Sequence, residues 1–468
     1  MARKKRKIVE QVQFSGIADK GLAVGRDPDG QVYFIDGAVP GDEATVEITR
    51  KKKGVPFEKV HHITKESIYR VEPFCQHFDL CGGCKWQNLS YEAQLREKDT
   101  YVRNAIQRIG KVEVGSWEPI LEGGKTKFYR NKLEYSFSSA RWMTEEEISS
   151  NEVITDKKGL GFNKAGTFDK VINLETCYLQ EAPSNEIRNW LRTYTSGEDF
   201  PYYSSRSKKG WLRNIMLRST EKGKFLVLIS FAYDDEKLRK QLLDDLIVSF
   251  PAIKSVFYVL SDKVNSVTID LDYHHYYGEK VLIEYLGDVA FQIGPKSFFQ
   301  TNTTQAVRLY DVVKEYADFK GNEIVYDLYT GLGSIALYIA NEVATVTGIE
   351  EIPEAIHYAN INKDLNNIGN AVFYTGDVKD ILTDAFVQKH GKADTIITDP
   401  PRIGMHPEVV NTLLESGAKK IVYVSCNPAT QARDIRLLSE KYEVKRLRPV
   451  DMFPHTHHVE SVALLELK

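Results

Sequence analysis

The sequence predicts an α/β chain in three parts: a small β barrel, a β-rich central domain, and a Rossmann-like domain with a doubly wound sheet. Three observations support this order. Residues 8–68 hold short β segments separated by Gly, Asp and Pro, and residues 128–285 are rich in β-forming and aromatic residues. In the last third of the chain, strands alternate with helices. We therefore expect domains at 1–68, 69–285 and 286–468.

The composition is that of a chain with packed cores. It has 468 residues, of which 42% are hydrophobic, which is enough for several folded domains. No apolar run approaches the roughly 18 residues that a membrane span needs. Residues 1–7 lack the apolar core of a signal peptide. We therefore expect a cytoplasmic protein.

The cations are clustered, although the formal net charge is only −3. They gather in residues 3–7, in residues 50–53, and at Arg206, Lys208, Lys209 and Arg213. Such patches can bind phosphate groups even on a slightly acidic chain. A solvated tail or loop explains each patch equally well, so charge alone leaves the partner open.

The first domain is expected to be a barrel because turn signals separate its short strands. We expect these strands at residues 11–14, 21–25, 32–35 and 42–49. So many short strands in this length suit a small closed barrel of the oligonucleotide-binding kind. A generic barrel or an SH3-like module fits the pattern as well, while the basic residues 50–53 favour RNA as the ligand.

The five cysteines indicate a metal centre and one chemically separate thiol. An odd number of cysteines without an export signal argues against a disulfide framework. Cys75, Cys81 and Cys84 lie close together, and Cys177 is the expected fourth ligand from another part of the fold. Such a site holds either zinc or an iron–sulfur cluster. The missing local fourth cysteine favours the cluster, and unliganded thiols are the remaining alternative. Cys426 is left for chemistry.

Two segments connect the barrel with the last domain. Residues 88–110 have one apolar face and predict a helix, which could pack on the catalytic domain. In residues 128–285, Arg and Lys alternate with aromatic residues, so this domain could stack on unpaired RNA and contact its phosphates. Ordinary alternation between the two faces of a sheet explains the same pattern.

In the last domain, the alternation of strands and helices predicts a mainly parallel sheet. We expect strands at 323–327, 345–350, 371–375, 395–398 and 421–425, followed by an antiparallel hairpin from residue 443 to the end.

A glycine-rich turn after the first of these strands predicts a cofactor site. Gly331 allows a ligand to approach the backbone, and Glu350 ends the second strand, where an acid would bind a ribose diol. Asp377 follows the third strand and suits an adenine amino group. The third glycine of the dinucleotide motif is replaced by Ala336. Together these features favour S-adenosylmethionine over NAD.

Two further strands predict reactive groups at the same edge of the sheet. Asp399 follows the strand at 395–398, and Cys426 follows the strand at 421–425. Open α/β sheets bind ligands outside the carboxyl ends of their strands. The alternatives are a buried, inert Cys426 and an Asp399 that only caps a turn.

Four motifs together resemble the RNA uracil-C5-methyltransferases: Asp-Pro-Pro-Arg at 399–402, Ser-Cys-Asn-Pro at 425–428, Pro-His-Thr-His-His-Val-Glu at 454–460, and Phe-Phe-Gln-Thr-Asn at 298–302. The first domain resembles the TRAM domain. The likeness spans essentially the whole chain. It is especially close to the bacterial branch that methylates 23S ribosomal RNA and carries a TRAM domain and a [4Fe-4S] cluster. We expect the transfer-RNA branch to lack the barrel and the cluster cysteines.

The resemblance implies an S-adenosylmethionine-dependent methyltransferase that forms 5-methyluridine in 23S ribosomal RNA. It implies that Cys426 is the nucleophile and Glu460 the general base. Ser334 stands where Asn is expected, so it is left out of the site. The remaining implied roles are binding of S-adenosylmethionine or the target base by Gln300, Tyr329, Glu350 and Asp399, and cluster binding by Cys75, Cys81, Cys84 and Cys177.

The chemistry explains why such an enzyme needs a thiol and a carboxylate. Carbon 5 of uracil is too weak a nucleophile to take a methyl group directly. A thiolate that adds to carbon 6 places negative charge on carbon 5. A carboxylate then removes the carbon 5 proton, so that the thiol can leave. The uridine must be unpaired or flipped out to be reached.

Three other functions fit parts of the sequence. One is a 5-methyluridine methyltransferase for transfer RNA. Another is an amino-group methyltransferase, whose acid-Pro-Pro-aromatic motif has Arg402 here in place of the aromatic residue. The last, from a different class, is a catalytically inert RNA-binding protein with a zinc site. No membrane and no obligate protein partner is indicated.

Overall fold

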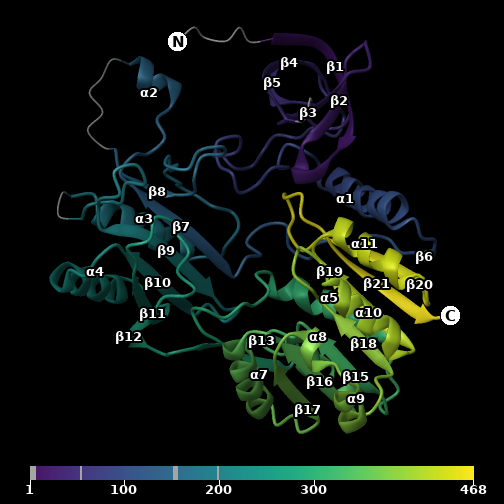
Figure 1. The fold of residues 1–468 in the computed structure, drawn as a ribbon. Coiled ribbons are helices and arrows are strands. Elements are labelled where there is room, and N and C mark those ends of the chain that lie inside the picture. The colour runs from purple at the N-terminus through teal and green to yellow at the C-terminus, as the bar shows by residue number, and fades with distance from the viewer. Residues whose placement is uncertain (1–6, 53–54, 151–156, 198–199) are drawn as a thin grey trace.

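The computed structural model describes residues 7–52, 55–150, 157–197 and 200–468. Figure 1 shows the barrel at the top, the central domain on the left, and the carboxyl-terminal sheet at the lower right. Residues 3–6 and 53 of the predicted basic patches lie outside the described residues, as do the side chains of residues 50–52. Within the described ranges, no helix is long and apolar enough to cross a membrane.

The barrel closes because its strands bury every second residue, as Val12 and Phe14 do in β1 and Ala44 and Val46 do in β4. Gly25 allows two strands to approach closely, since a Cβ there would lie 2.6 Å from Val12 Cγ1. The strands are β1 (Lys7–Ile17), β2 (Ala23–Arg26), β3 (Val32–Asp36), β4 (Glu43–Lys52) and β5 (Val55–Lys65), joined in the order β1-β2-β3-β5-β4. A short 3-10 turn, η1 (Asp19–Gly21), precedes β2.

The central domain contains a six-stranded sheet in the order β12-β11-β10-β9-β7-β8. Its pairs are antiparallel except β10 with β11, which run parallel because helix α4 crosses over between them. The bounds are β7 (Lys132–Ser138), β8 (Gly159–Gly161), β9 (Leu212–Ser219), β10 (Phe225–Phe231), β11 (Ile253–Leu260), β12 (Tyr273–Gly278), α2 (Glu145–Ser149), α3 (Ser184–Tyr194) and α4 (Glu236–Ser249).

The carboxyl-terminal domain is a doubly wound sheet of eight strands in the order β17-β16-β15-β18-β19-β21-β20-β6. Strands β15 to β19 are parallel, and β21 inserts antiparallel between β19 and β20. The bounds are β15 (Ile324–Leu328), β16 (Thr345–Glu350), β17 (Ala371–Thr375), β18 (Thr395–Thr398), β19 (Lys420–Ser425), β20 (Tyr442–Val450) and β21 (Glu460–Leu467).

Helices cover both faces of this sheet, because successive strand residues point to opposite sides. Val325 belongs to the core under one set of helices, and Tyr326 belongs to the core under the other. The first set is α5 (Thr303–Ala317), α6 (Ser334–Ile339) with η3 (Ala340–Glu342), and α7 (Pro353–Leu365). The second set is α8 (Val378–Ile381), α9 (Asp384–His390), α10 (Pro407–Ser416) and α11 (Pro428–Leu438).

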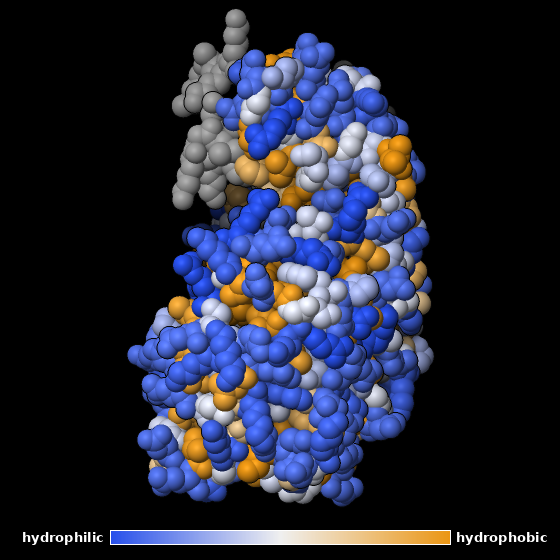
Figure 2. Space-filling model, turned by 90° about the vertical axis from the view of Figure 1, so that its right-hand side faces the viewer, coloured by the Kyte–Doolittle hydropathy of each residue, from blue (hydrophilic) through white to orange (hydrophobic). Residues whose placement is uncertain are grey.

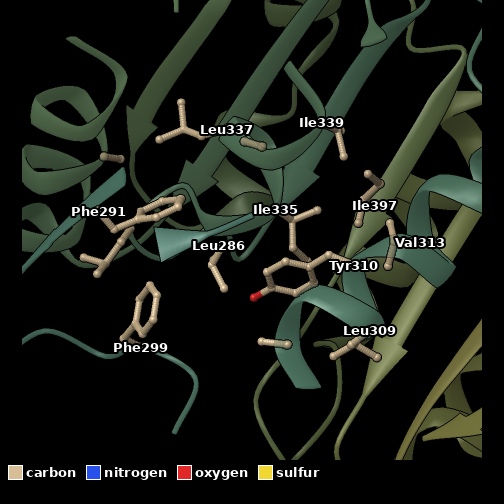
Figure 3. Packing of buried hydrophobic residues seen from close by; sticks show 14 of the residues in the cluster. Leu286, Phe291, Phe299, Leu309, Tyr310, Val313, Ile335, Leu337, Ile339 and Ile397 are labelled. Atoms are coloured by element: carbon tan, nitrogen blue, oxygen red, sulfur yellow. The ribbon is translucent and has the colours of Figure 1, made fainter. Parts of the chain in front are cut away.

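Two elements cross the domain limits that the sequence predicts. Strand β6 (Val114–Trp117) falls within 69–285, yet it pairs with β20 of the last sheet. The hairpin of β13 (Leu282–Leu286) and β14 (Val289–Ile293) spans the limit at 285 and packs on α5 and α7. Figure 3 shows Leu286 and Phe291 of this hairpin on one side of the shared core, opposite Tyr310 of α5.

The predicted helix at 88–110 is α1 (Tyr91–Ala105) followed by one turn of π-helix, η2 (Ile106–Gly110). Its apolar face, with Val102 and Ile106, is buried in the same core as Ile435 of α11. Gly110 permits this approach, since a Cβ there would lie 3.2 Å from the Ala432 carbonyl oxygen. The helix and β6 therefore extend the catalytic domain beyond residues 286–468.

The predicted fold class is confirmed: a Rossmann-like sheet follows an amino-terminal barrel and a β-rich middle.

On the side of the molecule turned toward the viewer in Figure 2, hydrophobic residues form small groups among hydrophilic ones.

Candidate active site

The sheet order reverses direction at β15, and this point sets the position of the site. From β15 the chain first adds β16 and β17 on one side, and then β18 and β19 on the other. Ligands of such sheets bind at this switch point, outside the carboxyl ends of the strands. Five predicted site residues come at or just after those ends, on five neighbouring strands: Tyr329, Glu350, Asp377, Asp399 and Cys426.

The turn after β15 is shaped by residues with positive φ. Tyr329 has a φ of 64° and Gly331 a φ of 57°. The Gly331 N–H donates to Glu350 Oε2 at 3.1 Å, and the Ile352 N–H donates to Glu350 Oε1 at 3.1 Å. These bonds hold the Glu350 carboxylate against the turn. A Cβ added at Gly331 would meet nothing within 4 Å, so this backbone is open to a ligand.

Asp327 lies beneath the turn, and the sequence analysis did not select it. Thr330 Oγ1 donates to Asp327 Oδ2 at 2.5 Å, and the Ala336 N–H donates to the same oxygen at 3.1 Å. Asp327 Oδ1 is buried and has no hydrogen-bond partner within the described parts of the chain. Burial raises the pKa of Asp327 to about 7. Its place at the end of a buried strand was the available signal.

The acids around the turn fit a cationic ligand better than a pyrophosphate. Asp327, Glu350, Asp377 and Asp399 all lie at this edge of the sheet. S-adenosylmethionine carries a sulfonium and an ammonium group, which carboxylates attract, whereas two phosphates would be repelled. The unpaired Asp327 oxygen is the kind of acceptor that such a ligand can satisfy.

Two further predicted residues, Asp377 and Gln300, come from other elements. Asp377 is the N-cap of α8, and its Oδ1 accepts the Lys379 N–H at 3.2 Å. Gln300 lies in the segment before α5, and its carbonyl accepts a bond from Asn131 Nδ2 at 2.8 Å. This bond connects the segment to the central domain.

The thiol and the predicted base come from adjacent strands. Cys426 follows β19, Glu460 begins β21, and Ser425 pairs with Ser461 between them. Glu460 is only 6% exposed. Burial, and then the neighbouring Asp399, raise the pKa of Glu460 to about 8. Burial, and then Asp327, raise the pKa of Asp399 to about 7.

Cys426 is a protonated thiol at neutral pH in this environment. Burial, and then Glu460 and Asp399, raise its pKa to about 11. Arg402 opposes them, because its charge and a side-chain hydrogen bond to the thiol both lower the pKa. The Arg402 carbonyl is fixed by Asn427 Nδ2 at 2.8 Å. The sequence analysis used Arg402 only as part of a motif, whereas the structure makes it the cation beside the thiol.

The other four cysteines converge on one pocket. Cys75, Cys81, Cys84 and Cys177 all line it, although Cys177 comes from a distant segment. Burial raises the pKa of Cys81 to about 12 and that of Cys84 to about 11. N–H groups approach the sulfur atoms: the Gly83 N–H lies 3.4 Å from Cys81 Sγ.

The four thiols limit which kinds of metal group this pocket could hold. Throughout the described ranges, no three His, Cys, Asp or Glu side chains are arranged to hold a metal ion. A tetrahedral zinc ion requires four ligands at short distances from one centre. Iron–sulfur clusters are also held by four cysteine thiolates. The four cysteines on the wall of this pocket are therefore a donor set that either group could use.

The predicted basic patch of the central domain loses one member. Arg213 is only 4% exposed and donates to the carbonyls of Ser261, Lys263 and Asn265 at 2.6–2.7 Å. Its role is to hold a loop, so it is not available for phosphate. Arg206 is exposed but pairs with Asp169.

The chain is similar to known RNA methyltransferases. The family model for tRNA (uracil-5-)-methyltransferase matches residues 263–468, and the TRAM domain model matches residues 3–57. An uncharacterized RNA methyltransferase of Bacteroides thetaiotaomicron is 46% identical over 97% of this chain and 100% of its own. Another, from Chlorobaculum tepidum, is 36% identical over 96% of this chain and 94% of its own.

Among solved structures, the chain resembles the Pyrococcus abyssi tRNA (uracil-54, C5)-methyltransferase in complex with S-adenosyl-L-homocysteine. The TM-score is 0.74 at 27% sequence identity, over 98% of this chain and 100% of that one. This transfer-RNA enzyme thus matches almost the full length of the chain, barrel included. The expectation that the transfer-RNA branch lacks the barrel is wrong in this case, so the barrel does not identify the RNA.

Proposed function

Because this chain belongs to the RNA uracil-5-methyltransferase family, whose members use S-adenosylmethionine, we propose that it forms 5-methyluridine in 23S ribosomal RNA through a covalent bond from Cys426 to carbon 6 of uracil. One observation carries the covalent mechanism: a thiol, a buried carboxyl group and a cation come from neighbouring strand ends, as Cys426, Glu460 and Arg402. Ribosomal RNA as the target would place the protein in the cytoplasm.

The cofactor would lie at the turn after β15. In this proposal the Gly331 backbone lies against it, Glu350 binds its ribose diol, and Asp377 accepts from its adenine amino group. Tyr329 and Gln300 border the same space. When bound, the cofactor supplies a methyl group on a sulfonium. The carboxylate of Asp327 favours that positive charge.

The thiol must pass its proton to solvent as it attacks, because Glu460 has to remain ionised for the later step. The pKa of Cys426 is raised to about 11, so little thiolate exists at neutral pH. Arg402 stabilises the negative sulfur as it forms. Asp399, with a pKa raised to about 7, is partly protonated at neutral pH. A protonated Asp399 can donate a hydrogen bond to the oxygen that becomes negative when carbon 6 is attacked.

Glu460 completes the reaction by taking the proton from carbon 5 after methylation. Its carboxyl group must be ionised to do so, and burial opposes ionisation. The electrons of the broken C–H bond re-form the ring double bond, and the Cys426 sulfur leaves carbon 6. The product is 5-methyluridine and the enzyme is regenerated.

The cysteine pocket is proposed to hold a [4Fe-4S] cluster on Cys75, Cys81, Cys84 and Cys177. The convergence of four thiols on one pocket and the N–H group near Cys81 Sγ support this proposal. Protein purified without oxygen should be brown and contain iron and acid-labile sulfide. Zinc in a colourless protein would exclude the cluster.

A covalent trap tests the mechanism. The protein and S-adenosylmethionine are mixed with 23S RNA fragments that contain 5-fluorouridine, and the products are analysed by denaturing mass spectrometry. Fluorine cannot be removed as a proton, so a methylated adduct should accumulate with wild type and be absent with Cys426→Ala. An adduct that persists in Cys426→Ala would exclude this nucleophile.

Transfer RNA is the second candidate substrate, because the Pyrococcus abyssi enzyme named above acts on uridine 54 of tRNA. The same trap with 5-fluorouridine transfer RNA separates the two substrates. An adduct on 23S fragments alone supports the proposal, whereas an adduct on transfer RNA alone replaces it.

A further inference from the structure

The segment 451–459, between β20 and β21, leads directly to Glu460. Helix α1 and the central domain both hold it. Asp451 forms a fully buried ion pair with Lys98 of α1, at 2.5 Å. Tyr129 of the central domain donates to the Pro454 carbonyl at 2.9 Å. The position of the catalytic carboxyl group therefore depends on contacts outside its own domain.

His455 is the most constrained residue of this segment. Its φ is 64°, a conformation that non-glycine residues rarely adopt. Its carbonyl accepts the N–H groups of Lys85 at 3.0 Å and Trp86 at 3.1 Å, the two residues that follow Cys84. Its ring contacts Phe74, the residue before Cys75, with centroids 5.0 Å apart. His455 thus touches both ends of the cysteine loop.

Gln94 of α1 fixes which ring nitrogen of His455 carries the proton. Gln94 Oε1 accepts the His455 backbone N–H at 2.9 Å. Gln94 Nε2 donates to the Trp86 and Leu89 carbonyls, both at 2.8 Å, so the orientation of the amide is unambiguous. His455 Nδ1 lies 3.1 Å from this Nε2. Since the amide presents N–H groups, Nδ1 must be unprotonated, and the proton lies on Nε2.

The His455 Nε2–H group makes no hydrogen bond of good geometry within the described ranges, and the Thr126 backbone is its one weak partner there. The residue is only 8% exposed. The same side chain lines the pocket of the four cysteines. A buried donor is normally paired. The pocket that this residue lines also carries the four cysteines, whose sulfur atoms accept hydrogen bonds when they are negatively charged.

We infer that His455 donates a hydrogen bond from Nε2 to the sulfur-rich group held by the four cysteines, and that this bond positions segment 451–459 and with it Glu460. The inference rests on the proposed cluster. His455 is a positioning residue, because it acts on the reaction only through Glu460. An occupied pocket completes the contacts of His455, whereas an empty pocket leaves its donor with only the weak Thr126 partner.

Two substitutions separate the Nε2 donor from the rest of the side chain. His455→Gln retains an N–H group near the position of Nε2. His455→Asn retains a polar group near Nδ1 and loses the donor; Asn also tolerates positive φ. An N–H donor stabilises the reduced, more negative cluster. The midpoint potential of the holoprotein should therefore fall in His455→Asn and stay close to wild type in His455→Gln.

The link to Glu460 is tested on unmodified target RNA. With His455→Asn, methyl transfer should continue while removal of the carbon 5 proton slows. The methylated covalent adduct should therefore accumulate several-fold over wild type, with unchanged S-adenosylmethionine affinity. Thr456→Val is the control. It removes a bond within the segment, from Thr456 Oγ1 to the Phe453 carbonyl at 2.8 Å, and should not alter the potential.

Three different outcomes would overturn different parts of this inference. Wild-type protein without iron and sulfide after anaerobic reconstitution would overturn the cluster and the role of His455 together. A cluster whose potential is the same in wild type and His455→Asn would overturn the hydrogen bond alone. A shifted potential without extra adduct would overturn the link to Glu460.

Discussion

At the scale of single residues, the proposed mechanism needs two groups in the protonation state opposite to the one that their surroundings favour. Cys426 must become a thiolate, yet its pKa is raised to about 11. Glu460 must become a carboxylate, yet its pKa is raised to about 8. Both shifts arise from burial and from neighbouring acids, because ionised groups are poorly solvated there. A cationic cofactor reduces this penalty, so its binding prepares the site.

A pH profile tests this view of Glu460. The base is active when ionised, so the rate of proton removal should rise with pH and level off above the pKa of about 8. The measurement is tritium release from 5-tritiated uridine in target RNA under single-turnover conditions. A rate that falls between pH 7 and pH 9, while adduct formation does not, would contradict this role.

Glu460→Gln removes the base and keeps the size of the side chain. Tritium release should fall by about 10²–10⁴-fold, the usual contribution of a general base. The methylated adduct should accumulate even on natural uridine RNA, because the thiol cannot leave. Cys426→Ala is the matched control, since it should form no adduct at all.

At the scale of elements, two glycines in the turn after β15 differ in the space around them. At Gly331 an added Cβ would meet open space, whereas at Gly333 it would lie 2.8 Å from Phe373 Cζ. Both residues have positive φ. Alanine pays about 1–2 kcal/mol in this conformation. Only Gly333→Ala should add a steric clash to that cost.

Gly331→Ala should therefore fold, with melting reduced by a few degrees, and bind S-adenosylmethionine at least about ten-fold more weakly, which corresponds to roughly 1.4 kcal/mol. Titration calorimetry and thermal melting measure the two effects. Gly37→Ala is the control, because Gly37 also has positive φ and open space but lies in the barrel. Unchanged affinity in Gly331→Ala would place the cofactor elsewhere.

Helix α1 is attached to the catalytic domain by a buried charge pair, and this too can be tested. In Lys98→Met, Asp451 keeps a buried charge without its partner, and stability should fall by about 3–5 kcal/mol. The double variant Lys98→Met with Asp451→Leu should recover much of the loss, because no buried charge remains. Urea unfolding gives both values. Equal losses in the single and double variants would contradict this account.

The elements also show what the sequence could predict. Strands 345–350, 371–375 and 395–398 match β16, β17 and β18 residue for residue, because each is a short run rich in β-forming residues. Strand β6 could not be assigned to the last sheet. It is short and only half-buried, and its partner β20 lies far away in the sequence.

The same contrast holds for the site. Residues at strand ends, such as Glu350 and Asp399, could be placed at the rim from the sequence, because one strand predicts one position there. Arg402 and His455 contact distant segments, which no local pattern reveals. Asp327 lies within reach of such reasoning, since it also ends a strand, but its buried and unpaired oxygen becomes visible only in the structure.

At the scale of the whole molecule, the three parts meet at segment 451–459. Gly21 of the barrel approaches it, since a Cβ there would lie 2.8 Å from His457 Cβ. Helix α1 holds Asp451, and the cysteine loop holds His455. The cofactor turn after β15 lies in another part of the same sheet. The proposed cofactor turn and the segment that leads to Glu460 are therefore held by different contacts within one catalytic domain.

Cys177→Ser separates these two dependences. Cys177 lies in the core of the central domain and brings a distant segment to the pocket, so its loss should loosen that domain. We expect faster proteolysis and loss of iron, while S-adenosylmethionine still binds at the Gly331 turn. Methylation should fall because segment 451–459 loses its support. Cofactor affinity that falls together with iron content would instead mean that the pocket and the turn form one cooperative unit.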